Sequence, residues 1–548
     1  MEVELNIYTY TLLAILISLL FAPLLCHRDP DIHPFALLYQ SLPSAIRQKK
    51  ESAIYRNPAT PHGTPLKTGL ALPCEKSWQT RDGDLRHIWN AYAESGPGKV
   101  LSLKGSQVTE VPVEKITRWI HILGSHLSQT SPTKRIALHL PNDIENLVAS
   151  FACHFYGLTL ILLPYPSDSK TITSILTKTQ ADLAITAAGV IPLNDLQSVP
   201  SLKNILYVVE PASRDLDWAT PPGSRLQTRT FHELISEDAT PTISPPNDID
   251  PNKSAIITAF TSISTGKLEV TEFSTRNLIA AIGAQLTSLP PSERFSAKDT
   301  FLPLDCLSLL YPRILTYTSL FSHSLLALTS ASGKTCNLIL SSHPISPTII
   351  AASSHALLTL LLQTKGTQME LWHNLISFFQ SRTLASGRIP RGNWLTRVND
   401  YTRPSLGNPH SLRLIFTHEL ALAKDTQPLN SYDLNDLRQF LAARVVYALC
   451  SPRVAGAICA QNVFDYRCER PERLPSRKLG VGRKCTHFGP PLGGAEVWVR
   501  EVEGYKVEEG EGAIWVRGPV VPGLEGREKG VGVGVVGRWR GDGCLEFV

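Results

Sequence analysis

The sequence predicts an α/β protein in which helices cover a mainly parallel sheet, followed by a β-rich segment. The first observation is that short apolar runs of strand length alternate with segments of helical period between residues 87 and 479. The second is that glycine becomes frequent from about residue 480, where short β-type runs appear. Forty prolines argue against a mostly helical chain, and 548 residues are enough for two or three domains.

The amino terminus begins with an almost wholly apolar stretch, residues 5–26. Its 22 residues would rise about 33 Å as a helix, and a hydrocarbon core is about 30 Å thick, so we expect a transmembrane anchor. Basic residues follow the stretch, among them Arg28 and Arg47, which predicts a body that faces the cytosol. A single-pass protein of the endoplasmic reticulum membrane is therefore expected, with the lipid bilayer as a partner. Residues 27–86 are interpreted as a juxtamembrane linker.

The sequence of the first half of the body predicts helices and strands in alternation. Residues 111–129 have apolar side chains at helical spacing, and the buried-type run Arg135–Leu140 predicts a strand. Asp143 is an expected N-cap for a helix over residues 143–156. The elements expected next are strands Leu158–Leu163, Leu183–Thr186 and Asn204–Val209 and a helix Thr171–Gln180.

A hydroxyl-rich turn then follows an apolar strand, Ser254–Phe260. The turn, TSISTGK, leads into a second short strand, Leu268–Phe273, and a helix from Thr275. Hydroxyls and free backbone N–H groups at such a turn can hold a phosphate. The sequence therefore predicts a phosphate-binding loop at this position.

The alternation continues beyond this loop. The expected helices are Thr275–Leu289, Tyr311–Leu320, Ile350–Leu362, Leu371–Phe379 and Ser431–Leu441, and the expected strands are Leu325–Thr329, Asn337–Ser341, Leu412–Phe416 and Val445–Leu449. Residues 480–548 are expected to form a β-rich, barrel-like subdomain.

Composition excludes two classes of partner. The net charge is only +5, and no dense stripe of lysine and arginine is interleaved with aromatic residues, so we expect no nucleic-acid partner. The ten cysteines show no metal-ligand spacing with each other or with histidine, so no metal site is expected from them.

Several motifs, in order along residues 87–548, resemble the adenylate-forming superfamily of acyl-CoA synthetases, luciferases and peptide-synthetase adenylation domains. TSISTGKLEV is similar to that family's phosphate loop, TSGSTGxPKGV, and FSTRNLIAA is similar to the helix that follows it. YALCS stands where YGxTE would be, and HFGPPLGGAEVWV, GEGAIWVRGP and GDGCLEFV resemble the motifs of its small barrel. These six motifs follow one another in the family's order, and they agree with the predicted order of helices and strands.

The resemblance implies a fold and a chemistry. The fold would be the large amino-terminal domain of such enzymes: two helix-covered, mainly parallel sheets over residues 87–479 and a β-barrel-like subdomain over 480–548. The chemistry would join ATP and a carboxylate into an acyl-adenylate, with Mg²⁺, and pass the acyl group to a thiol. The residual nucleotide site would comprise Thr261, Ser262, Ser264, Thr265, Gly266, Lys267 and Tyr447. The chain ends at Val548, where the family continues into a mobile carboxy-terminal domain, so no catalytic residue is assigned.

The sequence departs from the family pattern at five places. Ile263 replaces a loop glycine, and Glu269 replaces the loop lysine, which turns attraction for phosphate into repulsion. Thr417-His418-Glu419 stands at the Gly-Gly-Ala adenine wall, and Ser451 stands at the glutamate that helps to hold Mg²⁺. The ribose-gripping Thr-Gly-Asp aligns with Val533-Gly534-Val535.

These departures leave two interpretations of the loop: a residual nucleotide site, or a strand–turn–strand that the fold requires. At the level of function, the first hypothesis is a membrane-anchored, catalytically degenerate protein that binds an acyl or lipid ligand or a protein partner. The alternative is a divergent long-chain acyl-CoA synthetase or acyl-adenylating ligase that uses Lys267.

Overall fold

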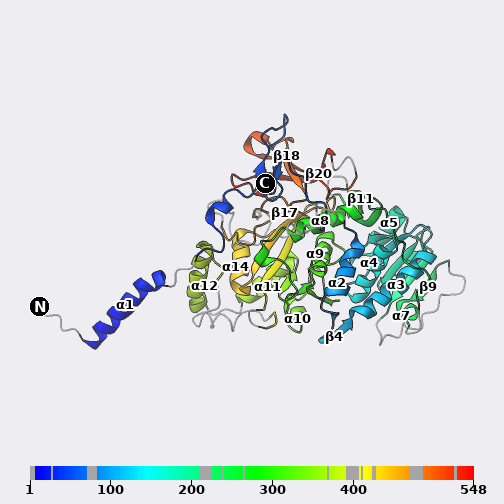
Figure 1. The fold of residues 1–548 in the computed structure, drawn as a ribbon, viewed down its shortest axis with the longest axis horizontal. Helices are drawn as coiled ribbons and strands as arrows, with labels where there is room; N and C mark the ends of the chain where they lie inside the picture. The colour runs from blue at the N-terminus through cyan, green and yellow to red at the C-terminus, as the bar shows by residue number, and fades with distance from the viewer. Residues whose placement is uncertain are drawn as a thin grey trace.

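Three sheets and the helices around them make up the body of the protein (Figure 1). The structure is a computed structural model, and it describes residues 6–25, 29–70, 83–209, 225–236, 240–262, 266–366, 370–390, 406–408, 411–422, 428–468, 486–523 and 528–548.

The first sheet has seven strands and carries the predicted phosphate loop at one edge. Its spatial order is β11-β10-β6-β5-β7-β8-β9, and every pair is parallel except β10 with β11. The strands are β5 (Arg135–His139), β6 (Thr159–Leu162), β7 (Leu183–Ala187), β8 (Asn204–Val208), β9 (Gln227–Thr230), β10 (Ser254–Thr261) and β11 (Leu268–Ser274). The nearly fully buried strands β5, β6 and β7 are what a parallel sheet covered on both faces requires.

The second sheet has eight strands, ordered β17-β16-β15-β14-β12-β13-β3-β4, and is parallel except for its two edge pairs. The strands are β3 (Lys99–Lys104), β4 (Gln107–Pro112), β12 (Thr300–Pro303), β13 (Leu325–Thr329), β14 (Ile349–Ala351), β15 (Leu414–Leu420), β16 (Arg444–Cys450) and β17 (Ala457–Ala460). Thr417 of β15 lies opposite Tyr447 of β16, and His418 lies opposite Ala448. This register brings the expected adenine wall and the expected YGxTE segment side by side.

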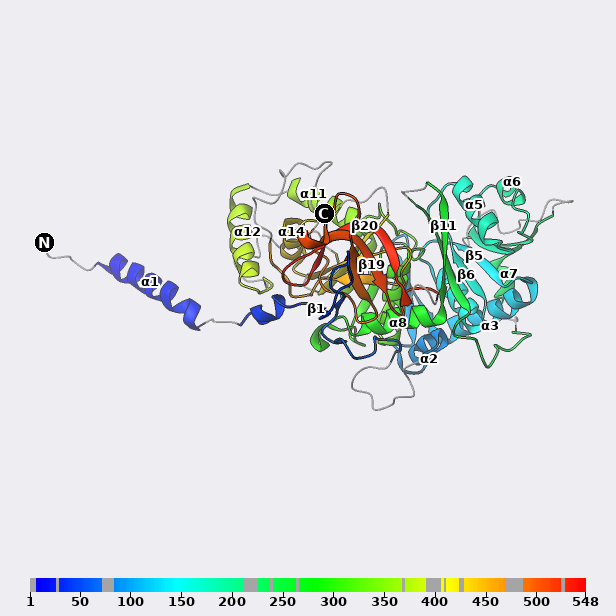
Figure 2. The same ribbon diagram turned by 90° about the horizontal axis from the view of Figure 1, so that it is seen from above.

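Helices pack on these two sheets (Figures 1 and 2). They are α2 (Leu85–Ser95), α3 (Val113–Thr130), α4 (Ile144–Phe155), α5 (Ser169–Thr179), α6 (Leu193–Gln197), α7 (Phe231–Leu234), α8 (Thr275–Leu286), α9 (Leu310–Phe321), α10 (Leu338–Ser342), α11 (Ser354–Gly366), α12 (Glu370–Ala385) and α14 (Ser431–Leu441). Helix α8 starts directly after the loop hairpin because Ser274 and Asn277 form a capping box.

The third sheet has six strands and is antiparallel, in the order β1-β2-β18-β19-β20-β21. Its carboxy-terminal strands are β18 (Glu496–Arg500), β19 (Glu511–Arg517), β20 (Val531–Trp539) and β21 (Leu545–Phe547). Strands β1 (Leu42–Pro43) and β2 (Tyr55–Arg56) come from the amino-terminal region and close one edge of the sheet. The β-type runs predicted after residue 480 are therefore strands, and residues far apart in the sequence complete their sheet.

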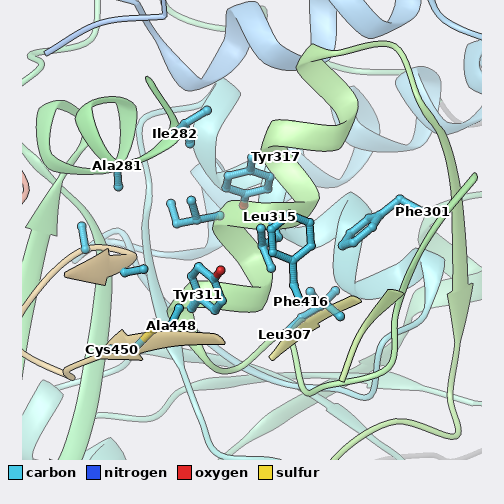
Figure 3. Close-up of a cluster of buried hydrophobic side chains, with 14 of the residues drawn as sticks. Ala281, Ile282, Phe301, Leu307, Tyr311, Leu315, Tyr317, Phe416, Ala448 and Cys450 are labelled. Atoms are coloured by element: carbon cyan, nitrogen blue, oxygen red, sulfur yellow. The ribbon is translucent and has the colours of Figure 1, made fainter. Parts of the chain in front are cut away.

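A continuous apolar core lies between α8, α9 and the eight-stranded sheet (Figure 3). Tyr311 and Leu315 of α9, Phe416 of β15 and Ala448 of β16 are all buried there. Tyr317, two turns along α9 from Tyr311, is buried as well. This core fixes α9 against the carboxyl ends of β15 and β16.

The predicted transmembrane anchor is wrong. The structure forms helix α1 over Ile7–Leu25, and within the described residues no helix is both long and apolar enough to cross a membrane. Helix α1 has 19 residues, fewer than the 22-residue stretch from which the span was predicted. Its first two turns also carry the hydroxyls of Tyr8, Thr9, Tyr10 and Thr11. The single-pass placement in the endoplasmic reticulum membrane, which rested on that anchor, is withdrawn with it.

The segment Asn337–Ser341 was expected as a strand and is helical instead. Asn337 precedes α10, and its side-chain oxygen accepts hydrogen bonds from the backbone N–H groups of Ile339 and Leu340. An N-cap of this kind stabilises the first turn of a helix. The short apolar run was compatible with both structures, and the cap decides between them.

Candidate functional site

The predicted phosphate loop is the tip of the β10–β11 hairpin, and the hairpin uses some of its own backbone groups. The N–H of Ser262 donates to the carbonyl of Lys267 at 2.9 Å, and the N–H of Gly266 donates to the carbonyl of Ser262 at 2.8 Å. Gly266 has φ +64°, a left-handed conformation that glycine adopts without strain. These two N–H groups are therefore not directed at an external phosphate.

The structure separates the predicted site residues into different environments. Thr261, Gly266 and Lys267 are exposed at the hairpin tip, whereas the adjacent Ser262 is buried. Ser264 and Thr265 lie outside the described residues, as does Ile263. Tyr447 is fully buried on β16.

Glu269, at the position of the family's loop lysine, is paired with an arginine. Nη2 of Arg453 lies 2.6 Å from Oε2 of Glu269, and Nη1 of Arg453 donates to the carbonyl of Gly532 at 3.0 Å. The guanidinium also lies over the ring of Phe260, 5.6 Å from its centroid. Arg453 thus joins the loop hairpin to β20 and neutralises the acidic side chain that the sequence analysis interpreted as repulsive toward phosphate.

Tyr447 is held by internal contacts on the other side of the site. Its hydroxyl donates to Oε2 of Glu419 at 3.0 Å and accepts from the N–H of Leu429 at 3.3 Å. The ring of Phe488 packs against it with centroids 5.1 Å apart. Glu419, which stands where the family keeps a small residue, is itself 2% exposed. The adenine side of the expected pocket is therefore filled by the protein's own side chains.

The positions expected for the metal and the ribose are also occupied internally. The Ser451 hydroxyl accepts a hydrogen bond from the N–H of Arg453 at 3.3 Å, which closes a short turn after β16. On β20, Val533 is buried, and a Cβ added to Gly534 would lie 2.6 Å from Cδ2 of Leu422. Neither segment offers a carboxylate at these positions.

A small cavity remains between the loop strand, the start of α9 and the ends of β15 and β16. Its volume is about 90 Å³. Apolar side chains make up most of the wall, and Thr258, Tyr311 and His418 are among its polar residues; Cys450 and Ser451 also line it. Pockets for drug-sized ligands run from about 300 to 1,000 Å³, so this space suits a much smaller group than an acyl-adenylate.

His418 has an acidic neighbour that the sequence did not reveal. Its Nδ1 lies 3.7 Å from Oδ2 of Asp305, and both side chains are buried. Burial lowers the pKa of His418, and the nearby Asp305 partly opposes that shift. Burial raises the pKa of Asp305, opposed by the charge that His418 would carry. Desolvation thus favours the uncharged form of each group.

This arrangement can be compared with known proteins. Residues 115–324 match the sequence model of the family described as AMP-binding enzyme, and this segment contains the loop hairpin, α8 and α9. Residues 115–324 therefore belong to the AMP-binding family.

The AMP-binding fold is recognisable in several solved structures. An anthranilate CoA ligase, AuaEII, in complex with anthranoyl-AMP, is 12% identical with a TM-score of 0.60, over 84% of this chain and 77% of the ligase. A long-chain-fatty-acid-CoA ligase of Archaeoglobus fulgidus is 14% identical with a TM-score of 0.58, over 88% and 86%. The N-terminal domain of FACL13 from Mycobacterium tuberculosis is 12% identical with a TM-score of 0.58, over 85% and 99%. At these identities the likeness concerns the fold.

One curated relative is an uncharacterized protein of Saccharomyces cerevisiae, YHR045W. It is 39% identical over 69 residues, which are 13% of this chain and 12% of the yeast protein. The match therefore spans about an eighth of that relative's length.

The family implies use of ATP or AMP. The residues of this chain at the expected site fit a bound nucleotide poorly. The cation nearest the loop acid, Arg453, is already paired, and Tyr447, which was predicted to belong to the nucleotide site, is buried and donates to Glu419. Within the described residues, no group of three or more metal-ligating side chains lies together. Sequence reasoning missed Arg453, Asp305 and Tyr311. The sequence analysis named His418, but its partner Asp305 lies in the connection after β12, so no local sequence pattern indicated the contact.

Proposed function

We propose that this protein is an acyl-CoA synthetase-like member of the AMP-binding family that does not adenylate carboxylic acids. In its place we propose binding of an acyl-type ligand in the cavity beside the altered loop. The observation that carries the proposal is the ion pair between Arg453 and Glu269, since it places an acid and its counter-ion where a triphosphate would have to lie.

The electrostatic consequence is substantial. A triphosphate at the loop would have to compete with Glu269 for Arg453, and it would then face the carboxylate itself. Two unpaired like charges 4 Å apart near a protein surface repel by about 4 kcal/mol. The guanidinium of Arg453 and the solvent keep the repulsion from Glu269 below that upper bound. The family's lysine would attract phosphate at the same place, so the substitution removes an attraction and adds a repulsion.

The adenine side adds an independent obstacle. Tyr447 would have to break its hydrogen bond to Glu419 and leave its contact with Phe488 before its ring could meet a base. Breaking a hydrogen bond to a buried carboxylate costs about 1.5–3 kcal/mol. Two separate changes therefore oppose nucleotide binding, one at each end of the expected site.

Pyrophosphate release by the full chain tests the proposal. ATP, Mg²⁺ and either a long-chain fatty acid or a short carboxylic acid should give no release above the blank, while an active acyl-CoA ligase run in parallel gives release. Glu269→Gln removes the acid without adding charge and Glu269→Lys restores the family's cation; we expect both to stay inactive because Tyr447 remains buried. ATP-dependent release by the unmodified protein would overturn the proposal.

A second candidate is a divergent long-chain acyl-CoA synthetase or acyl-adenylating ligase. The observation in its favour is that the hairpin is retained and that Lys267 is exposed at its tip, two residues before Glu269. Under this reading, Lys267→Ala would abolish pyrophosphate release, and the matched change Lys298→Ala at another exposed lysine would not. Absence of release in the unmodified protein removes this candidate.

A further inference from the structure

The small cavity beside the loop carries polar groups that the protein itself does not satisfy. The Tyr311 hydroxyl is buried and has no hydrogen-bond partner, and Oγ1 of Thr258 is in the same condition. Both residues line the cavity, Tyr311 from the first turn of α9 and Thr258 from β10. Buried hydroxyls are normally bonded, so two hydroxyls without a protein partner on one cavity indicate that water or a ligand inside the cavity bonds them.

Tyr311 is firmly placed in this wall. It is 2% exposed, and its ring meets the ring of His418 edge-on with centroids 5.3 Å apart. The view of the core shows it next to Cys450 and Ala448 of β16 (Figure 3). Since the ring is packed on these sides, the hydroxyl cannot turn out to solvent without unpacking the core.

The charges around the cavity select against an anion. No lysine or arginine is present among the residues that line it in the described part of the chain. The nearest ionisable pair, His418 with Asp305, is buried, and burial favours the uncharged form of each. If Asp305 does ionise, its negative charge opposes a carboxylate further. A buried carboxylate without a cation is strongly disfavoured.

The size of the cavity limits the ligand. Its volume of about 90 Å³ is well below the roughly 150 Å³ of an apolar cavity that admits benzene. It is still several times the 10–15 Å³ that one water needs. A molecule of about four or five non-hydrogen atoms is the appropriate size.

From these observations we infer that the cavity binds a small, uncharged molecule with an apolar body and one carbonyl or hydroxyl oxygen, held by Tyr311 and Thr258. The inference rests on the proposed function, because it assumes that a nucleotide no longer occupies the site. It specifies the ligand as an uncharged acyl derivative, such as a carboxamide, and excludes the carboxylate that an adenylating enzyme would take.

Propionamide and propionate make a matched pair of probes. They have the same number of non-hydrogen atoms and nearly the same shape, and at pH 7 only propionate is charged. Titration of the full chain, followed by ligand-observed NMR, should show propionamide binding at least tenfold more tightly than propionate. Equal affinity, or no binding of propionamide at concentrations of tens of millimolar, would overturn the inference.

Two variants on the same helix identify the binding group. Tyr311→Phe removes the orphan hydroxyl and keeps the ring, and it should weaken propionamide binding by about fivefold to tenfold. Tyr317→Phe is the control: its hydroxyl is hydrogen-bonded to Nε2 of His154 at 2.9 Å and it does not line the cavity. Binding by Tyr317→Phe should be unchanged. Equal losses in the two variants would contradict a role for Tyr311.

The pyrophosphate assay on the same preparation separates the two proposals. If the protein releases pyrophosphate, the proposed function fails. If it releases none and propionate binds as well as propionamide, the proposed function stands and the ligand class is wrong. If it releases none, propionamide binds selectively and only Tyr311→Phe weakens it, both are supported.

Discussion

Arg453 and Glu269 form an ion pair across 184 residues of sequence, with Nη2 and Oε2 2.6 Å apart. Because Arg453 also donates to the carbonyl of Gly532, one side chain connects the loop hairpin, the turn after β16 and strand β20. The sequence analysis predicted that these three segments contribute to the nucleotide site. The pair therefore links the loss of a phosphate-binding cation to a structural contact that takes its place.

The ion pair should contribute modestly to stability. Both side chains are about one-third exposed, and pairs of this kind are worth about 0–1 kcal/mol. A double-mutant cycle with Arg453→Met and Glu269→Gln should give a coupling energy of about 0.5–1 kcal/mol in urea unfolding, and 1 M salt should reduce it. A coupling energy of zero at low salt would show that the pair does not form in solution.

Tyr447 and Tyr311 should respond oppositely to loss of their hydroxyls. Tyr447→Phe breaks a buried hydrogen bond to Glu419 and should lower the free energy of unfolding by about 1.5–3 kcal/mol. Tyr311→Phe removes a buried hydroxyl that has no partner, so it should leave stability unchanged or raise it slightly. Chemical denaturation of both variants measures the difference. Similar destabilisation by the two changes would contradict the contacts described for these residues.

Stability should fall in mildly acidic solution because of His139. Burial lowers the pKa of this histidine, on β5, to about 4, whereas an unfolded chain has a value near 6.5. Between these values the unfolded state binds a proton that the folded state does not, so stability is intact above about pH 6.5 and declines as pH falls toward 4. The full loss from this residue is ~3 kcal/mol.

A variant isolates that contribution. His139→Asn should reduce the decline between pH 6.5 and 4 in urea unfolding by the ~3 kcal/mol of this residue, even if it costs stability at pH 7. Burial also lowers the pKa of His154 and His487, so the rest of the decline should persist. His343→Asn changes an exposed histidine and should leave the wild-type pH profile in place. If His139→Asn retains the full decline, the other buried histidines carry it.

The order of strands and helices was largely predictable because apolar periodicity encodes it. The loop strand was expected over Ser254–Phe260 and spans Ser254–Thr261. Residues 337–341 were misassigned because their run of three apolar residues, Leu338–Leu340, has no distinctive period, and the Asn337 cap decides their structure. The apolar residues at the amino terminus do form a helix, but α1 does not qualify as a membrane span.

The site was less predictable than the fold. The sequence identified Glu269 as an acid in a phosphate loop, but its partner lies far along the chain, and nothing local to Arg453 signals the contact. The same holds for His418 and Asp305, which sit 113 positions apart and meet only when β15 packs beside β14 and the segment after β12. The orphan hydroxyl of Tyr311 is a property of packing, which no residue pattern expresses.

Calorimetric titration of the full chain with ATP in the presence of Mg²⁺ tests the central claim most directly. The acid–arginine pair at the loop and the buried Tyr447 predict no measurable heat of binding at millimolar nucleotide and no rise in melting temperature. Saturable binding of ATP with one site per chain, weakened by Lys267→Ala, would show that the nucleotide site is intact and would contradict the account.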